Sequence, residues 1–367
     1  MKKQWFRYAG FWLVTALWLA LAVFAWVKPA DAASDAERRP LEQFPEITAQ
    51  SVLSGEFSKD FGKYAVDQFP MRDGWRRVNA VLNYYGLQKK DNNGIYLHDG
   101  WAAKMEYPLK EDMIDYAAAR FDDLYRMYLA DSDCTIGFGV VPEKGYYLAQ
   151  SAGALGLDYD SLLSRLEQQL PWAQMIDLTG LLTAQSYYRT DTHWSQDQIV
   201  PAAERIAAFF GAKVPGGFTE QILERPFYGV YYGQAALPMQ PDTLRYLTWE
   251  GWQDCEVYSY DTGKTTKIYD MDKLDSRDLY DVFLSGGMAV QTITNPHADT
   301  DRELVIFRDS FGSSLAPLLV QSYAKVTLLD TRYIAPGALG QYVEFTDQDV
   351  LFLYSPLVLN ASTILRK

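Results

Sequence analysis

The sequence predicts an α/β fold, in which a doubly wound parallel sheet carries helices on both faces. Short apolar runs typical of buried strands alternate with longer segments whose apolar residues recur at three- and four-residue steps. This alternation indicates strand-helix-strand units. The chain has 367 residues, 48% of them hydrophobic, so it can bury a sizeable core in one large domain or two smaller ones.

Residues 1–33 are predicted to be a membrane anchor or a signal peptide. Basic residues precede an uncharged apolar run from Tyr8 to Val27, which is long enough to cross a bilayer as one helix. Positive charge before the run predicts that the N-terminus stays in the cytoplasm and the rest is exported. The Ala-Asp-Ala sequence at 30–32 resembles a cleavage site, so secretion after cleavage is the alternative to a single-pass anchor in the cell membrane. In both cases the remaining chain is expected outside the cytoplasm.

Residues 34–110 are predicted to form a linker and an N-terminal helical region. Residues 33–44 are polar and charged without a regular period, as in a linker. Within residues 54–85, apolar side chains recur at helical spacing on both sides of Pro70. We therefore expect two packed helices joined at a break.

Residues 111–367 are predicted to form the main α/β domain. The strongest helix signal covers residues 111–129, and a second helix is expected over 159–170. Buried strands are expected at residues 134–141, 173–178, 303–307, 325–330 and 349–354.

A β-rich insertion is predicted at residues 211–296. This segment is rich in Tyr, Gly, Thr and Asp, and the Asp-Thr-Gly turn at 261–263 lies between two β-type runs. We interpret the segment as one wall of a cleft that contacts a substrate. A surface lid without ligand contacts is the alternative.

The composition limits the possible partners. A net charge of -13 argues against a nucleic-acid partner, which requires a basic face. Aromatic residues make up 15% of the chain, which suits a groove for sugar rings, although half-buried strand tyrosines explain the excess equally well. The two cysteines, Cys134 and Cys255, are compatible with a disulfide but do not require one. No metal-ligand spacing occurs, and we expect no metal and no cofactor.

Two short motifs contain the three side chains that activate a serine nucleophile. Residues 191–194 read Asp-Thr-His-Trp, and residues 308–312 read Arg-Asp-Ser-Phe-Gly. A serine hydroxyl becomes nucleophilic when an imidazole accepts its proton and a carboxylate orients that imidazole. The motifs thus predict a triad of Asp191, His193 and Ser310. A capped helix start and a chance Asp-x-His are the alternatives.

Ser310 is expected on a turn between a strand and a helix. Residues 303–307 are apolar, and small residues precede the apolar run that follows the serine. At such turns the N–H groups of the first helical turn can stabilise an oxyanion, and we expect those of Phe311 and Gly312 to do so. The other two histidines, His98 and His297, have no carboxylate two residues before them and are expected to be non-catalytic.

The segments 190–195 and 309–312 resemble SGNH-hydrolase-like proteins of bacterial polysaccharide O-acetylation, which include the periplasmic alginate acetylation proteins and the DHHW family. The DHHW proteins are most similar, because further segments match over nearly the whole mature chain. These segments are residues 37–41, 44–45, 67–73, 93–96, 141–144, 241–243, 283–287 and 330–333. One departure concerns Pro201, which replaces a Gly-Ala-containing helix start and predicts that this helix begins near the proline.

The resemblance implies an SGNH-like serine O-acetyltransferase whose Asp-x-His motif precedes the serine, as in a circular permutation of ordinary SGNH hydrolases. It also implies a polysaccharide acceptor and, as acetyl donor, a membrane-bound O-acyltransferase. A carbohydrate acetylesterase of the same fold is one alternative. A non-catalytic, membrane-tethered glycan-binding or scaffold protein is the other.

Five residues near the motifs are candidates for substrate binding. Lys144 lies in the family's Val-Pro-x-Lys element, and we interpret it as lining the cleft rather than as a solvated lysine. Arg332 and Tyr333 follow a strand, where the arginine is able either to orient an acyl or sugar oxygen or to form a structural ion pair. Arg308 is expected to hold the oxyanion or to pair with its neighbour Asp309. Trp194 follows the catalytic histidine and completes the set.

Overall fold

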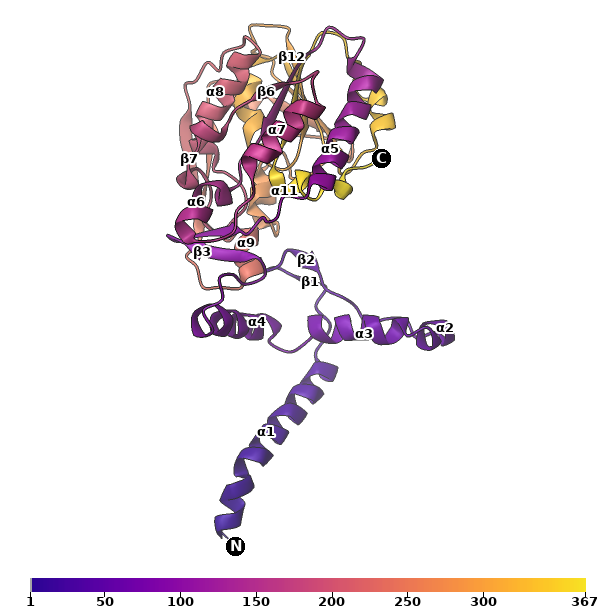
Figure 1. The fold of residues 1–367 in the computed structure, drawn as a ribbon, viewed down its shortest axis with the longest axis vertical. Helices are drawn as coiled ribbons and strands as arrows, with labels where there is room; N and C mark the ends of the chain where they lie inside the picture. Colours follow the sequence, from indigo (N-terminus) through magenta and orange to yellow (C-terminus); the bar gives the residue numbers. More distant parts are fainter. Residues whose placement is uncertain (1) are drawn as a thin grey trace. The chain divides into compact units, whose positions relative to one another are not determined.

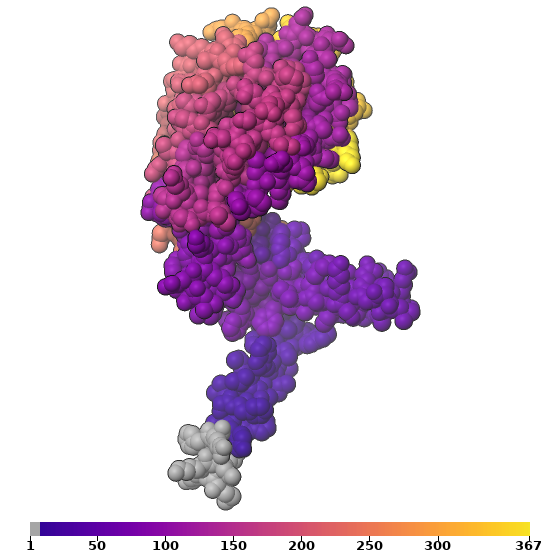
Figure 2. All heavy atoms as spheres, in the orientation of Figure 1, coloured from indigo at the N-terminus to yellow at the C-terminus, as the bar shows by residue number. Residues whose placement is uncertain are grey.

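A computed structural model of the protein describes residues 2–367, with side chains from Tyr8 on (Figures 1 and 2). The described chain divides into two compact units. Unit 1 comprises Met1–Asn92 and Gly233–Pro238, and unit 2 comprises Asn93–Tyr232 and Met239–Lys367. The predicted boundary at residue 110, between the N-terminal helical region and the main α/β domain, stays a prediction.

Unit 1 is mainly helical. Its helices are α1 (Lys2–Val27), α2 (Ala49–Leu53), α3 (Glu56–Asp67) and α4 (Arg72–Val81), and the two-residue strands β1 (Ala33–Ser34) and β2 (Arg39–Pro40) pair with each other. The two helices predicted around Pro70 are therefore present. A π-helical turn over Leu82–Gly86 follows α4.

Helix α1 contains an apolar stretch from Tyr8 to Val27 with a mean hydropathy of 2.0, and none of it is buried. Its length and composition suffice to cross a membrane, as expected from the sequence. A signal sequence has the same properties, so either an anchor or a signal peptide fits this helix.

Unit 2 is a mixed α/β structure around one eight-stranded sheet (Figure 1). Its strands are β5 (Thr135–Val140), β6 (Gln174–Ile176), β9 (Glu256–Ser259), β10 (Lys264–Thr266), β11 (Val290–Thr294), β12 (Glu303–Arg308), β13 (Lys325–Leu329) and β14 (Asp349–Tyr354). They lie in the order β10-β9-β11-β13-β12-β14-β5-β6. The five predicted strands β5, β6, β12, β13 and β14 are mutually parallel neighbours, and the sheet is mostly parallel.

The wholly parallel sheet that the sequence predicts is wrong at one edge. Strands β9, β10 and β11 run antiparallel to their neighbours and extend the sheet beyond β13. The predicted hairpin accounts for β10, because the turn at residues 261–263 sends it back along β9, whereas β11 is itself antiparallel to both β13 and β9. Three strands of the predicted insertion, β9, β10 and β11, thus belong to the central sheet. Whether it is an insertion in a permuted fold stays a prediction.

Helices cover both faces of the sheet. The helices of this unit are α5 (Glu111–Leu124), α6 (Lys144–Ala152), α7 (Tyr159–Gln169), α8 (Val200–Phe209), α10 (Gly312–Leu319) and α11 (Pro356–Leu359); α9 (Val230–Ala235) crosses the boundary between the units. Alternate residues of β12 enter two different cores: Leu304 and Ile306 pack with α8 and α10, whereas Val305 and Phe307 pack with α5 and α7. This alternation produces the doubly wound arrangement.

Two short hairpins lie outside the central sheet. Strands β3 (Ile95–His98) and β4 (Trp101–Lys104) form one, and β7 (Thr219–Phe227) and β8 (Asp242–Thr248) form the other. The sequence reasoning missed both hairpins. Each joins strands that lack a long apolar run, so tertiary packing decides their conformation.

Candidate active site

The three predicted catalytic side chains form one continuous chain of polar contacts. Oδ2 of Asp191 lies 2.6 Å from Nδ1 of His193, and Nε2 of the same ring lies 2.8 Å from Oγ of Ser310. Asp191 is fully buried and His193 nearly so. When Nδ1–H donates to the carboxylate, Nε2 has a free lone pair for the serine proton. This arrangement can generate a serine nucleophile.

Two aromatic rings hold the His193 imidazole in its plane. The ring of Tyr280 stacks on it with a centroid distance of 3.8 Å and an interplanar angle of 6°. The ring of Phe311 lies 5.2 Å away and is tilted by 59°. The hydroxyl of Tyr280 donates to Oγ of Ser314, which fixes the tyrosine in turn. The imidazole therefore has little freedom to rotate away from Ser310.

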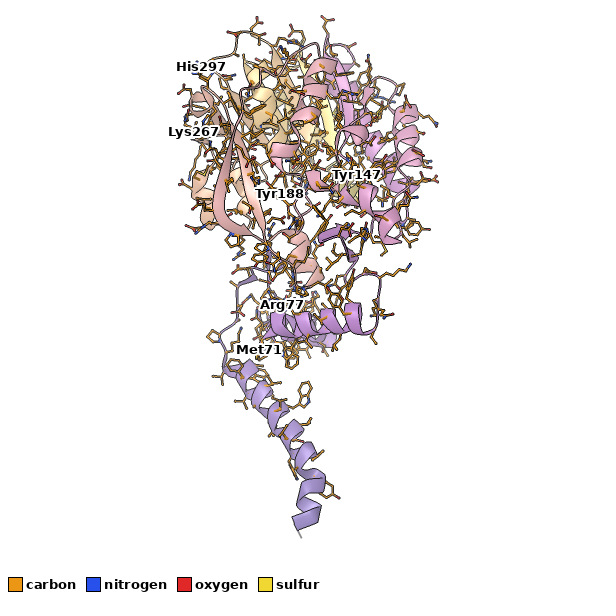
Figure 3. The ribbon with its side chains drawn as sticks, turned by 90° about the vertical axis from the view of Figure 1, so that its left-hand side faces the viewer. Met71, Arg77, Tyr147, Tyr188, Lys267 and His297 are labelled. Carbon is orange, nitrogen blue, oxygen red and sulfur yellow. The ribbon has the colours of Figure 1, made fainter. Side chains whose placement is uncertain are left out.

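The backbone loop that carries Asp191 and His193 is hydrogen-bonded to two charged side chains, Lys144 and Asp242. The ammonium of Lys144 donates to the carbonyl oxygens of Tyr188, Arg189 and Asp191 at 2.8, 3.4 and 2.5 Å; Tyr188 is labelled in Figure 3. The carboxylate of Asp242 accepts from the backbone N–H groups of Arg189 and Thr190, both at 2.7 Å. One cation binds the loop's acceptors and one anion binds its donors.

The segment at residues 229–230 approaches Asp191 closely. The N–H of Val230 donates to Oδ1 of Asp191 at 2.7 Å, and the N–H of Gly229 donates to the Thr190 hydroxyl at 2.8 Å. A Cβ on Gly229 would lie only 2.1 Å from the Cβ of Asp191. Only glycine permits this approach, which gives the second carboxylate oxygen its own donor.

Ser310 lies on the turn between β12 and α10, as predicted. Asp309 stabilises this turn, because its carboxylate accepts from the N–H groups of Phe311 at 3.1 Å and of Ser355 at 2.8 Å. The N–H of Gly312 donates to the Asp309 carbonyl at 3.1 Å. The two N–H groups predicted to hold an oxyanion are thus both engaged within the turn. Across the described residues the N–H of Ser310 donates no hydrogen bond, so it is the more available donor.

Three of the residues predicted to bind substrate are completely buried, which corrects that interpretation. Lys144 contacts the loop carbonyls described above. The indole N–H of Trp194 donates to the Phe311 carbonyl and to Ser314 Oγ, so the tryptophan ties the Asp-His loop to the serine helix. Arg308 lies beneath the serine turn, where its guanidinium is 3.3 Å from Gln291 Oε1. Each side chain is used in positioning the turn or the loop, and none reaches solvent.

The other two candidates differ in exposure. Arg332 forms a bidentate ion pair with Asp330 at 2.9 and 2.6 Å, which is the structural alternative foreseen for it. Tyr333 is exposed and stacks under the Arg332 guanidinium at 5.4 Å. Among the five candidates, only Tyr333 offers a largely free surface to a substrate.

Sequence reasoning missed four residues that contact the catalytic loop or ring: Asp242, Gly229, Tyr231 and Tyr280. All four lie within the predicted insertion at 211–296. The segment 241–243 matches the family pattern, but its sequence does not indicate that Asp242 binds the loop. No periodicity in the sequence predicts that Tyr280 stacks on a distant histidine. These residues contact Asp191, His193 or the loop that carries them, whereas the role of the segment as the wall of a substrate cleft stays a prediction.

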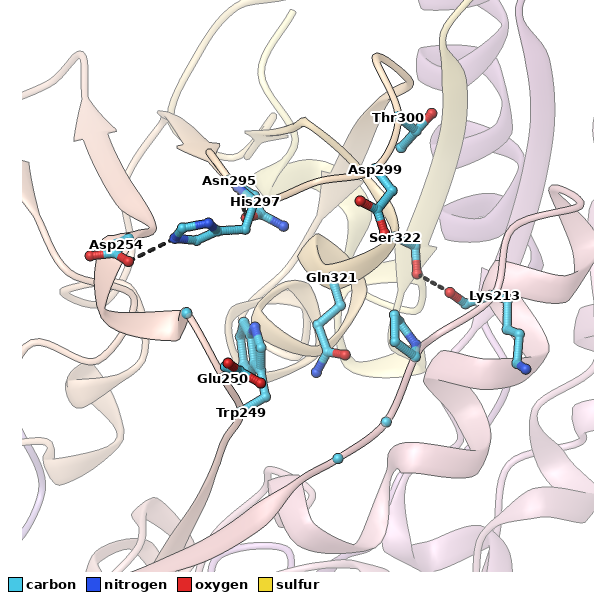
Figure 4. Close-up of a pocket in the computed structure, with 14 residues that line it drawn as sticks. Lys213, Trp249, Glu250, Asp254, Asn295, His297, Asp299, Thr300, Gln321 and Ser322 are labelled. Carbon is cyan, nitrogen blue, oxygen red and sulfur yellow. Dashed lines mark hydrogen bonds and ion pairs between the residues drawn. The ribbon is translucent and has the colours of Figure 1, made fainter.

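A separate hollow lies elsewhere in unit 2. Its volume is about 1070 Å³, and Figure 4 shows Trp249, His297 and Gln321 among its lining residues. Asn295 and Thr300, which also line it, lie between the end of β11 and the start of β12. Ser310 follows the opposite end of β12, so this hollow is not the site of the triad. Among the described residues, no group of three His, Cys, Asp or Glu side chains is arranged to hold a metal ion.

Comparison with known proteins identifies the fold. No family model and no curated protein matches the sequence. A DHHW family protein from Eubacterium siraeum has a TM-score of 0.59 at 21% identity, over 76% of this chain and 97% of that one. Bacillus cereus PatB1, solved with a sulfonyl adduct, has a TM-score of 0.58 at 18% identity, over 74% of this chain and 98% of that one. The resemblance to the DHHW proteins is thus confirmed, and the chain has the fold that these two proteins share.

Proposed function

We propose that this protein is an extracytoplasmic serine O-acetyltransferase that transfers acetyl groups to a polysaccharide at the cell surface. The observation that carries the proposal is the unbroken contact chain from Asp191 through His193 to Ser310, at 2.6 and 2.8 Å. The similarity in fold to a DHHW protein and to PatB1 supports it.

In the first step, the Ser310 hydroxyl attacks the carbonyl carbon of an acetyl donor. His193 takes the serine proton on Nε2, and Asp191 stabilises the imidazolium that forms. We expect the N–H of Ser310 to stabilise the oxyanion, with those of Phe311 and Gly312 contributing after local adjustment of the turn. The imidazolium then protonates the departing group of the donor, which leaves an acetyl ester on Ser310.

In the second step, a sugar hydroxyl attacks the acetyl-serine. The neutral His193 accepts the hydroxyl proton and returns a proton to Ser310 Oγ as the ester bond to the enzyme breaks. The products are an acetylated sugar and the free serine. We expect a membrane-bound O-acyltransferase to supply the acetyl group, because cytoplasmic acetyl-CoA does not reach the exported domain. No cofactor is required by these steps.

The sulfonyl adduct in PatB1 suggests a direct probe. Sulfonyl reagents form stable bonds with activated nucleophiles, and we expect Ser310 to react with them in the same way. The full chain in detergent would be treated with a sulfonyl fluoride and digested for mass spectrometry. The expected result is one modified serine at position 310, and no modification in a His193→Ala variant. Modification of another residue in place of Ser310 would contradict the proposed nucleophile, and equal labelling of Ser310 in both proteins would contradict its activation by His193.

A carbohydrate acetylesterase would use the same first step, with water as the second nucleophile. Incubating the chain with 4-nitrophenyl acetate and an oligosaccharide separates the two reactions. Acetylated oligosaccharide in excess of free acetate supports the transferase. Acetate alone supports the esterase. A chain that releases no nitrophenol but binds the oligosaccharide would support the non-catalytic scaffold.

A further inference from the structure

The N-cap residue of α4, the helix itself and the π-helical turn that follows it expose a row of large apolar side chains. The row consists of Met71, Trp75, Val78, Leu82 and Tyr85, spaced by three or four residues, and we call it the outer stripe. The exposed fractions are 70, 45, 53, 60 and 55% in that order. The sequence pattern predicts that this row packs inward. The structure instead leaves it uncovered, and Figure 3 labels Met71 at its start.

The polar side of the same helix faces its own unit. Arg72 and Arg76 form ion pairs with Glu37 at 2.5 and 3.2 Å, and Ala80 is completely buried. A helix of a soluble protein normally buries its apolar side and exposes its charges. In α4 the apolar row is exposed together with Asp73, Arg77 and Asn79, so the outer stripe is suited to a non-aqueous environment outside the unit. Single exposed apolar residues need no explanation, but an aligned row of five does.

More apolar surface is exposed in the same unit. Its other exposed large apolar residues between α1 and residue 92 include Phe44, Ile47, Val52, Leu53, Val66, Val81 and Leu87. Part of this surface is braced by an aromatic cluster in which Phe44 contacts the rings of Phe57, Phe61 and Tyr64. The unit therefore holds its helices through aromatic and ionic contacts while leaving many aliphatic groups outside.

The local charge favours an anionic surface as the cover of the outer stripe. Residues 56–90 contain seven basic and four acidic residues, a net charge of +3, although the whole chain carries -13. The basic residues are Lys59, Lys63, Arg72, Arg76, Arg77, Lys89 and Lys90. Arg72 and Arg76 are paired with Glu37 and Lys63 with Asp60, and we assign the lipid contact to Lys59, Arg77, Lys89 and Lys90. An apolar row flanked by Lys and Arg is the pattern of a helix that lies in the interface of an anionic membrane. A soluble acidic partner would not need the apolar row.

The position in the chain agrees with a membrane. The outer stripe begins at Met71 and belongs to the same compact unit as α1, whose stretch Tyr8–Val27 is long and apolar enough to cross a bilayer. Trp75 and Tyr85 are of the residue types that concentrate at the level of lipid headgroups. A spanning helix holds the residues that follow it near the membrane surface. The outer stripe can contact lipid there.

We propose that α4 and its π-helical turn lie on the membrane surface, with the outer stripe at the boundary between acyl chains and headgroups and with nearby Arg and Lys side chains at anionic phospholipids. The chain then has two membrane contacts, α1 and the outer stripe. The second contact keeps the protein at the surface even after cleavage near Ala32. This inference does not depend on the chemistry of Ser310.

The test measures the depth of spin labels on the full chain in nanodiscs of phosphatidylglycerol and phosphatidylcholine. Labels are attached at Val78→Cys and at Leu82→Cys, in a background carrying Cys134→Ala and Cys255→Ala. The matched control is Asp73→Cys, because Asp73 lies on the same helix, outside the stripe, with a 49% exposed side chain. A label at Leu17→Cys in α1 verifies reconstitution.

We expect molecular oxygen to collide with the labels at 78 and 82 several times more effectively than a nickel chelate does, and the reverse at 73. Equal access of the chelate at 78 and 73, with the label at 17 still in lipid, would place the stripe in water and overturn the proposal. Exclusion of both reagents at 78 would overturn it as well, because a second copy or another protein would then cover the stripe. The circular-dichroism spectrum and melting temperature of each labelled variant control for folding.

Discussion

Two histidine-carboxylate pairs in unit 2 have nearly the same contact distance but different surroundings. His193 lies 2.6 Å from Asp191, and His297 lies 2.7 Å from Asp254. The side chains of the first pair are 8% and 0% exposed, whereas those of the second are 56% and 64% exposed. A short contact between an imidazole and a carboxylate is therefore common to a candidate catalytic site and to an open surface hollow.

The difference lies in what surrounds each ring. The other nitrogen of His193 contacts Ser310, and Tyr280 stacks on its face. Within the described chain, no serine or threonine hydroxyl is hydrogen-bonded to the ring of His297. Water also screens the exposed pair, whereas burial leaves the first pair's interaction strong. Burial, a nucleophile and a fixed ring, rather than the pair distance, distinguish a triad.

Removing the nucleophile should have the largest effect. We expect Ser310→Ala to lower the rate of nitrophenol release from 4-nitrophenyl acetate by about 10³-fold or more, because no acyl-enzyme can form. Stopped-flow absorbance would measure both the burst and the steady rate. The matched control is Ser58→Ala, an exposed serine of unit 1, which should leave both unchanged. Retention of the burst by the Ser310 variant would refute the triad.

The carboxylate that orients the ring should come next. Asp191→Asn would donate to the imidazole instead of accepting from it, which favours the wrong tautomer, and we expect a rate loss of about 10³-fold. The N–H of Val230 would also lose its charged acceptor. Circular dichroism and the melting temperature would verify that the variant is folded. A loss below tenfold would mean that Asp191 is only structural.

The two pairs also show how far the sequence could predict this site. The Asp-x-His and Asp-Ser-Phe-Gly motifs identified Asp191, His193 and Ser310, because their spacing along the chain reflects local turns. Strand β12 and helix α10 were predictable from their apolar patterns. Gly229 and Asp242 were not, since each acts on the catalytic loop only through tertiary contact. The buried state of Lys144 and Trp194 likewise depends on packing that no local pattern encodes.

A small steric change next to Asp191 should disturb the buried His193–Asp191 pair. In Gly229→Ala, the added Cβ would lie 2.1 Å from the Cβ of Asp191, so the carboxylate or its loop must move. A shift of this size at a catalytic group costs about 10²-fold in rate. Gly180→Ala is the control, because nothing lies within 4 Å of its added Cβ. Equal rates for the two variants would show that the approach of residue 229 is unimportant.

Lys144, which binds the loop that carries Asp191 and His193, should have a smaller, pH-dependent effect on stability and activity. Burial lowers the pKa of Lys144 to about 8, although the charges of Glu143, Asp191 and Asp242 oppose this shift. Between pH 8 and its ordinary value of 10.5, the unfolded chain binds more protons at this lysine than the folded chain does. The contribution of Lys144 to the free energy of unfolding therefore rises with pH in that window.

Activity should change in the opposite direction. Above pH 8 the neutral amine loses one of the three N–H groups that match the three loop carbonyls, so the loop loosens and the acylation rate falls. Lys144→Met should lower the rate about tenfold at pH 7 and remove this alkaline decrease. Lys264→Met, at an exposed strand position, serves as the control. The same alkaline decrease in wild type and in Lys144→Met would exclude the lysine as its source.

Disrupting the exposed His297–Asp254 pair should have the smallest effect on activity. We expect His297→Ala to leave nitrophenol release within about twofold of wild type, because, among the described residues, the His297 ring hydrogen-bonds only to a solvent-exposed carboxylate. The stability should also change little, since water replaces the lost contact. Stopped-flow rates and thermal melting would measure both. A tenfold or larger loss of activity with an unchanged melting temperature would mean that the hollow near Trp249 takes part in the reaction, and that burial is not what separates the two pairs.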